Sequence, residues 1–266
     1  MTQRQAFISM KKILILLAAL CLLLAGCMPP VQSLRLLPGS TPVGMQEERP
    51  AHTLPPETEP PSPFRTDLSV EDVILYFNEV CLDAEYVSGG NPSLVQKWDE
   101  PIRYRIFGAP TEEDLRVLED LVAWLNTVEG FPGMYPAGDA CAPNLQIHFC
   151  DQDEMVELLG SNFTYADGGV TFWYDGNNRI YDAIICCRTD LDQHLRNSVI
   201  LEEIYNGLGP VQDTDLRPDS LIYSGYTEPQ AMTGVDELIL RLLYHPDIKC
   251  GMTAAQCEQV IRQLCG

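Results

Sequence analysis

Two adjacent glutamates, Glu202 and Glu203, stand in an apolar stretch in the last third of the chain, and Asn206 follows the first at a distance of four residues. Residues four apart lie above one another on a helix, so Glu202 and Asn206 share a face and Glu203 lies beside them. Paired carboxylates can act as general acid and base. Together with the amide oxygens of Asn206 and Gln212, and with Asp213 and Asp215 just beyond, they also offer oxygen ligands to a hard cation.

The same spacing occurs in the zinc-binding helix pattern H-E-x-x-H, whose extended form continues x-x-G-x-x-H. In this frame Glu202, Asn206 and Gln212 occupy the three histidine positions, and only the general base Glu203 and the glycine Gly209 keep their identity. Amide oxygens are poor zinc ligands, so we expect neither a metal nor another cofactor. We favour a buried hydrogen-bonded network of these side chains beneath an open cleft over a working catalytic site.

The helix that carries these residues is predicted over about 191–208, because Leu201, Ile204 and Leu208 recur at helical spacing before Gly209 and Pro210 stop it. Capping-box patterns predict four further helices, which begin at Ser69, Thr111, Thr233 and Thr253. Strands are predicted at 97–107 and 145–150, a short helix at 152–159 and a hairpin at 169–187. This order predicts an α+β fold, with one mixed sheet packed on the central helix and with C-terminal helices.

Four blocks of sequence between 201 and 253 resemble an uncharacterised bacterial family known as domain of unknown function 2927. The blocks are Leu201-Glu202-Glu203-x-x-Asn206-x-Leu208-Gly209, Arg217-Pro218-Asp219-Ser220, Asp236-Glu237-Leu238-x-Leu240-Arg241-x-Leu243-Tyr244-x-Pro246 and Gly251-Met252-Thr253. The element order also resembles the metzincin-type zincins. The resemblance implies a single zincin-like domain that lacks the zinc ligands, a pseudoenzyme rather than a peptidase. It brings no established activity.

The N-terminal 26 residues have the pattern of a secretion signal, with Lys11 and Lys12 before an apolar run at 13–24. Leu24-Ala25-Gly26-Cys27 resembles the bacterial lipobox, which implies cleavage before Cys27 and attachment of lipid, such as palmitate, to that cysteine. Residues 27–66 hold ten prolines and few bulky apolar residues, which predicts a disordered tether. The folded domain is then 67–266, anchored by lipid on the extracytoplasmic face of the cell membrane.

Cysteine content and charge limit the partners further. Eight cysteines remain after Cys21 and Cys27, and an even number outside the cell predicts disulfides. Local candidates are Cys141 with Cys150, and Cys250 with Cys257 or Cys265. A formal net charge of −21 excludes nucleic acid as a partner.

We therefore expect a lipoprotein, most simply a monomer, whose degenerate metallopeptidase-like domain binds a peptide, a protein or a cell-wall component without cleaving it. The alternative is a hydrolase of peptides or glycans that uses Glu203 together with Glu202 or with a non-zinc cation.

Overall fold

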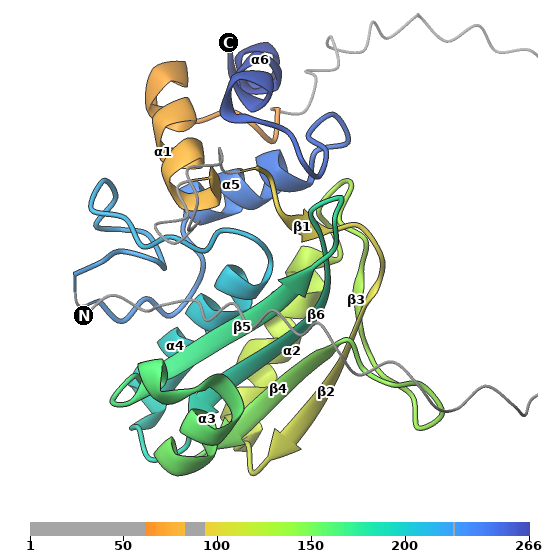
Figure 1. Cartoon of the computed structure of the whole chain (residues 1–266). Helices are drawn as coiled ribbons and strands as arrows, with labels where there is room; N and C mark the ends of the chain where they lie inside the picture. Colours follow the sequence, from red (N-terminus) through yellow and green to blue (C-terminus); the bar gives the residue numbers. More distant parts are fainter. Residues whose placement is uncertain (1–61, 83–93, 226) are drawn as a thin grey trace, which may run out of the picture. The chain divides into compact units, whose positions relative to one another are not determined.

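The computed structural model describes residues 62–82, 94–225 and 227–266. The predicted signal segment, Cys27 and nearly all of the tether lie outside these residues. Within them the chain forms the predicted α+β fold, a mostly parallel sheet with helices on both faces and further helices at the C-terminal end (Figure 1). None of the described helices is long and apolar enough to cross a membrane.

The sheet has six strands in the order β1-β6-β4-β2-β3, with β5 paired antiparallel to β6. The strands are β1 Lys97–Trp98, β2 Ile102–Gly108, β3 Met134–Pro136, β4 Leu145–Cys150, β5 Gly168–Tyr174 and β6 Arg179–Arg188. The predicted hairpin is therefore confirmed as β5 and β6. The single strand predicted at 97–107 is wrong, because the chain leaves the sheet before Pro101, which has no N–H to donate to a ladder. As a result β1 pairs with β6, whereas β2 pairs with β4 and β3.

Each helix predicted from a capping pattern is present. The helices are α1 Val70–Leu82, α2 Glu112–Leu125, α3 Gln152–Leu159, α4 Gln193–Gly207, α5 Gly234–Tyr244 and α6 Ala254–Cys265. Full capping boxes close the N-termini of α2, α5 and α6, and the Ser69 hydroxyl accepts the Asp72 amide at the start of α1. These caps satisfy amide groups that the first helical turn leaves without partners, which is why the starts were predictable from sequence.

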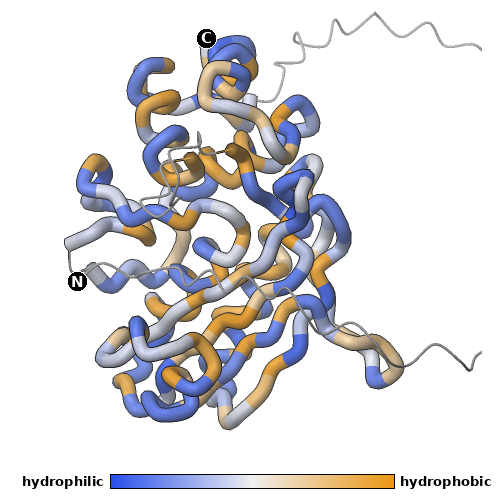
Figure 2. Tube along the Cα trace, in the orientation of Figure 1, coloured by the Kyte–Doolittle hydropathy of each residue, from blue (hydrophilic) through white to orange (hydrophobic). Residues whose placement is uncertain are grey.

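The central helix α4 packs against β5, β6 and α2, whereas α3 contacts β5 and β6. Figure 1 shows α4 and α2 on one side of the sheet and α3 on the other. The apolar segments run through the strands between these layers (Figure 2). Cys187 belongs to the main core and its neighbour Cys186 to a smaller core with Met155 of α3, so successive side chains of β6 face opposite layers, as period-two alternation requires.

A buried ion pair fixes α4 to α2. Arg196 Nε lies 2.8 Å from Asp114 Oδ1, and both side chains are almost fully buried. The Gln193 amide donates to the same carboxylate oxygen at 2.7 Å. Because α4 is buried on nearly every side, the position of its two glutamates is set by the core.

The predicted disulfides are not formed, because every cysteine in the described residues is a free thiol. Cys141 is exposed, whereas its expected partner Cys150 is buried and hydrogen bonds with Cys186. The Cys250 thiol donates to the backbone oxygen of Lys97 at 3.6 Å.

Candidate functional site

Glu202 and Glu203 of α4 line one pocket of about 320 Å³. Adjacent helical residues point about 100° apart, yet both reach this space because the pocket extends across the face of the helix. Its walls come from Asp167 and from Gly168 at the start of β5, from α4, and from the irregular segment between α4 and α5, with Asp213 and Tyr223. Glu203 is 1% exposed, whereas Glu202 is half-buried.

Gly168 lets strand β5 approach the helix at Glu203. A β carbon at this position would lie 2.5 Å from Val199 Cγ1 and 2.9 Å from both Cγ and Oε1 of Glu203. Only a residue without a side chain fits here, so the close approach of β5 holds Glu203 at the floor of the pocket.

The electrostatics of the pocket are dominated by carboxylates. Burial, together with the negative charges of Asp213 and Asp167, raises the pKa of Glu202 to about 8. No Lys, Arg or His is among the described residues that line this pocket. Glu202 is therefore mostly protonated at neutral pH, because burial and the two neighbouring carboxylates disfavour its negative charge.

Asn206 and Gln212 form no hydrogen bond with Glu202 in the described part of the chain. Asn206 is buried, and its Oδ1 has no hydrogen-bond partner among the described residues. The Gln212 amide donates to the backbone oxygen of Asp213 at 3.4 Å. Within the described part of the chain, no hydrogen bond connects Glu202, Asn206 and Gln212, so the network that we expected is absent. The open cleft above the helix is present.

Gly209 has a backbone explanation that involves no ligand. Its φ is +129°, and a β carbon there would lie 2.6 Å from the backbone oxygen of Gln96. The glycine of the motif frame thus serves the turn that ends α4.

The described residues contain no group of three or more His, Cys, Asp or Glu side chains arranged to hold a metal ion. Asp213 contributes to the acidic pocket as its position in sequence suggested, but Asp215 instead accepts a hydrogen bond from Ser224. Sequence reasoning missed Asp167, which reaches the pocket from the strand side. Its signal is weak, since an Asp before two glycines is also an ordinary turn pattern.

Fold and site together define an α+β domain with a carboxylate-lined pocket over its central buried helix. Residues 71–263 match the family described as Protein of unknown function (DUF2927), and the chain belongs to this family. The match confirms the family resemblance drawn from the blocks between 201 and 253. No curated protein matches the chain.

Proposed function

We propose that this protein is a lipid-anchored, extracytoplasmic binding protein. Its zincin-like domain receives a positively charged group of a peptide, a protein or a cell-wall component without cleaving it. The observation that carries the proposal is the acidic pocket, where Glu202, Glu203, Asp167 and Asp213 meet without a cationic side chain among the described lining residues.

The physical argument is that the carboxylates of Asp167 and Asp213 repel a negative charge on Glu202, and that no described cationic side chain lines the pocket. A ligand ammonium or guanidinium placed among them favours the ionised form of Glu202, and its binding is strengthened in return. Leu195, Val199 and Leu221 supply apolar wall for an aliphatic stem, as suits a Lys or Arg side chain. A volume of about 320 Å³ admits one such side chain or a small amine-bearing group.

The zincin-like and lipoprotein parts of the proposal are supported by different features. The residues at the H-E-x-x-H positions, Glu202, Glu203 and Asn206, lie on α4. This helix packs against the antiparallel edge strand β5 and carries both glutamates into the pocket. Anchoring is supported by the lipobox-like Leu24-Ala25-Gly26-Cys27 and by the proline-rich segment that follows it. A tether of that composition would hold the pocket away from the bilayer surface.

The experiment is a calorimetric titration of the mature protein with short lysine-containing peptides and with the same peptides acetylated on the lysine side chain. We expect the charged peptides to bind at least 10-fold more tightly, and Glu202→Gln to lose most of this preference. Glu119→Gln, which removes one charge from an exposed position of α2, is the matched control and should bind as the wild type does. Equal affinity for charged and acetylated peptides would refute the proposal.

A hydrolase is the second candidate, and one observation favours it. Glu202, with its pKa of about 8, is protonated at neutral pH beside the carboxylates of the pocket, which suits a general acid paired with a general base. In that case Glu203→Gln would lower turnover of a peptide or glycan substrate by 100-fold or more, on the order expected for general acid–base catalysis. Absence of turnover across peptide and glycan libraries at pH 5–9 would remove this candidate.

A further inference from the structure

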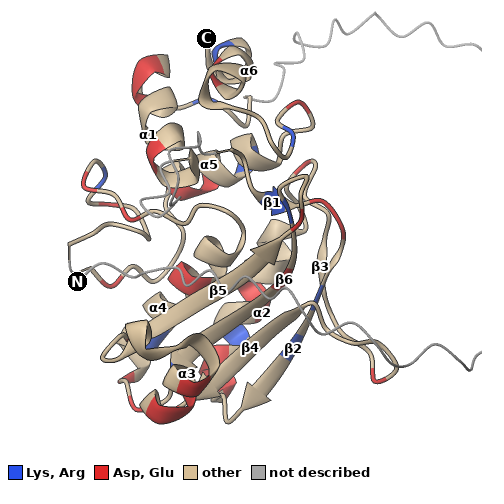
Figure 3. Ribbon diagram, viewed as in Figure 1, with Lys and Arg blue, Asp and Glu red and all other residues tan. Residues whose placement is uncertain are grey.

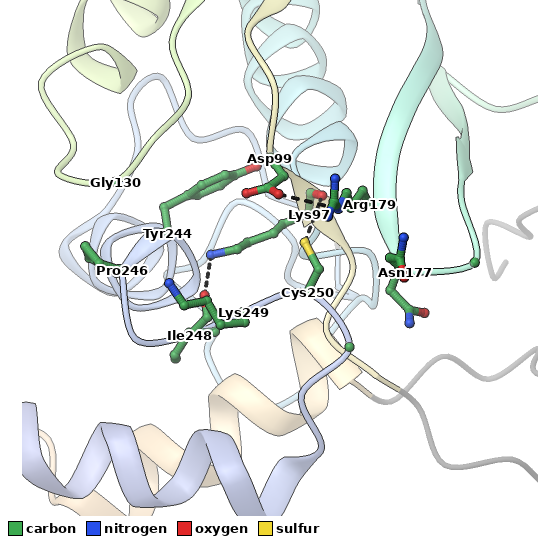
Figure 4. Close-up of a pocket in the computed structure, with 13 residues that line it drawn as sticks. Lys97, Asp99, Gly130, Asn177, Arg179, Tyr244, Pro246, Ile248, Lys249 and Cys250 are labelled. Atoms are coloured by element: carbon green, nitrogen blue, oxygen red, sulfur yellow. Dashed lines mark hydrogen bonds and ion pairs between the residues drawn. The ribbon is translucent and has the colours of Figure 1, made fainter.

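The two lysines of the described residues meet at a second pocket. The chain has four lysines, Lys11, Lys12, Lys97 and Lys249, and the first two lie in the predicted signal segment. Lys97 of β1 and Lys249 after α5 line one pocket of about 650 Å³, which also contains Arg179 and Asp99 (Figure 4). Its lining shares no residue with that of the acidic pocket. Figure 3 shows basic residues in blue at β1, the strand that consists of Lys97 and Trp98.

Lys97 is a buried cation without a carboxylate partner among the described residues. The residue is 6% exposed, and its Nζ donates to the backbone oxygens of Leu243 at 2.7 Å and Ile248 at 2.6 Å. An ammonium carries three N–H donors, so one remains for another acceptor. The Tyr244 ring lies 5.4 Å from Nζ and adds cation–π attraction. Burial lowers the pKa of Lys97 to about 8, the direction expected for an ammonium that lacks a counterion.

The other two cations of the pocket are also available to a ligand. Lys249 is exposed, and its ammonium makes no hydrogen bond or ion pair with the described residues. Arg179 lies 3.5 Å from Asp99, the one carboxylate of the pocket, and 47% of its side chain is exposed. Elsewhere in the described part, six arginines form ion pairs: Arg116, Arg188, Arg196, Arg217, Arg241 and Arg262. The lysine pocket instead holds an excess of two positive charges when Lys97, Lys249, Arg179 and Asp99 are ionised.

We propose that this lysine pocket binds a phosphate monoester, with the phosphate held by Lys97, Lys249 and Arg179. A phosphate monoester carries a charge of about −1.5 to −2 at neutral pH, which balances the excess of the pocket, whereas a single carboxylate does not. Lysine ammonium groups act as point charges toward phosphate oxygens, and the arginine can donate two parallel hydrogen bonds.

The remaining lining indicates what kind of organic group the phosphate carries. Asn177 and Asn178, in the turn between β5 and β6, offer amide donors and acceptors, and Tyr244 and Pro246 form an apolar wall on another side (Figure 4). A small hydroxylated carbon skeleton, such as that of a sugar or glycerol phosphate, matches both surfaces. The volume of about 650 Å³ leaves space for this group beside the phosphate.

The test titrates the mature protein with inorganic phosphate, glycerol phosphate and acetate at constant low ionic strength, with binding followed by calorimetry. We expect saturable binding of both phosphates, tighter for glycerol phosphate, and at least 5-fold weaker binding in Lys249→Gln. Lys249 is exposed, so this variant is expected to fold. Arg103→Gln removes the same charge from an exposed position outside the pocket and should leave the affinity unchanged.

Three results would overturn the proposal: no saturable binding of either phosphate, an equal loss in Arg103→Gln, or acetate binding as tightly as phosphate. Lys97→Met supplies an independent readout. We expect this variant to lose phosphate binding although a cooperative unfolding transition shows that it is folded. Wild-type affinity in a folded Lys97→Met protein would contradict the role of this lysine.

Discussion

Gly168 of β5 and Glu203 of α4 are so close that a single methyl group at residue 168 would collide with the glutamate side chain, at 2.9 Å from its Cγ and Oε1. This contact fixes the edge strand of the sheet against the helix that carries both glutamates. It makes the pocket a consequence of the packing between strand and helix, and it explains why a buried carboxylate holds a defined position there.

Gly168→Ala should therefore disturb both stability and binding. The added methyl must displace Val199 and Glu203, and overpacking of this kind costs about 1–3 kcal/mol. Urea unfolding should show this loss, and the affinity for a lysine-containing peptide should fall with it. Gly138→Ala is the control, because a β carbon there meets no atom within 4 Å, and it should not destabilise the protein. A Gly168→Ala protein as stable as the wild type would show that β5 is not held as described.

Glu202 should make stability depend on pH. Its pKa is raised to about 8 in the folded protein, so the folded state holds the proton more tightly than the unfolded state. The resulting stabilisation is complete below the ordinary glutamate pKa of about 4.3 and is lost as pH rises through about 8.

Thermal unfolding between pH 4 and pH 9 measures this effect. Glu202→Gln should flatten the decline in melting temperature over that range, because a glutamine does not titrate. Glu119→Gln should retain the decline, since it removes an exposed carboxylate of α2. Identical pH profiles for the wild type and Glu202→Gln would rule out the raised pKa.

The buried pair of Asp114 and Arg196 should be among the most sensitive positions of the domain. Asp114→Ala would leave a buried guanidinium without its carboxylate, and such a loss costs about 3–5 kcal/mol. Asp120→Ala breaks an exposed pair with Arg116 on the same helix and should cost less than about 1 kcal/mol. Chemical denaturation of both variants compares them, and similar costs would mean that the buried pair does not hold α2 to α4.

A hydrogen-bond chain joins α1, the irregular segment and α5. The Tyr76 hydroxyl donates to Ser220 Oγ at 2.7 Å, and the Ser220 hydroxyl donates to Asp236 Oδ1 at 2.7 Å. Ser220→Ala would leave two buried polar groups without this partner, at a cost of about 1–3 kcal/mol. Ser161→Ala, at an exposed site, should be neutral. Equal unfolding midpoints for these two variants would contradict a structural role for the chain.

Local signals predicted much of this fold. The caps at Thr111 and Thr253 and the hairpin turn between β5 and β6 are read from neighbouring residues, and all are present. The short strand β3 was missed because three residues at an edge carry no periodic pattern. Pro101 indicated a break in the strand, but the alternation of apolar residues on both sides of it favoured one continuous strand.

The candidate site was only partly predictable, because local spacing identifies residues on one helix but not residues that come from distant segments. The spacing of Glu202 and Glu203 is local, so their common helix followed from sequence. Asp167 precedes them by more than thirty residues, and only the pairing of β5 with β6 brings it to the pocket. Likewise, only the tertiary structure brings Lys97 and Lys249 to the same pocket. The sequence gives one signal for them, which is that lysine is rare in this chain.

The most direct test of the central claim is the number of protons released when a lysine-containing peptide binds at pH 7. Calorimetry in buffers of different ionisation enthalpy gives this number. Glu202 is protonated in the free protein at that pH and ionised beside a cation, so we predict that close to one proton is released per peptide. Glu202→Gln should release almost none. Binding without proton release, or with the same release in Glu202→Gln, would contradict a cation site at this glutamate.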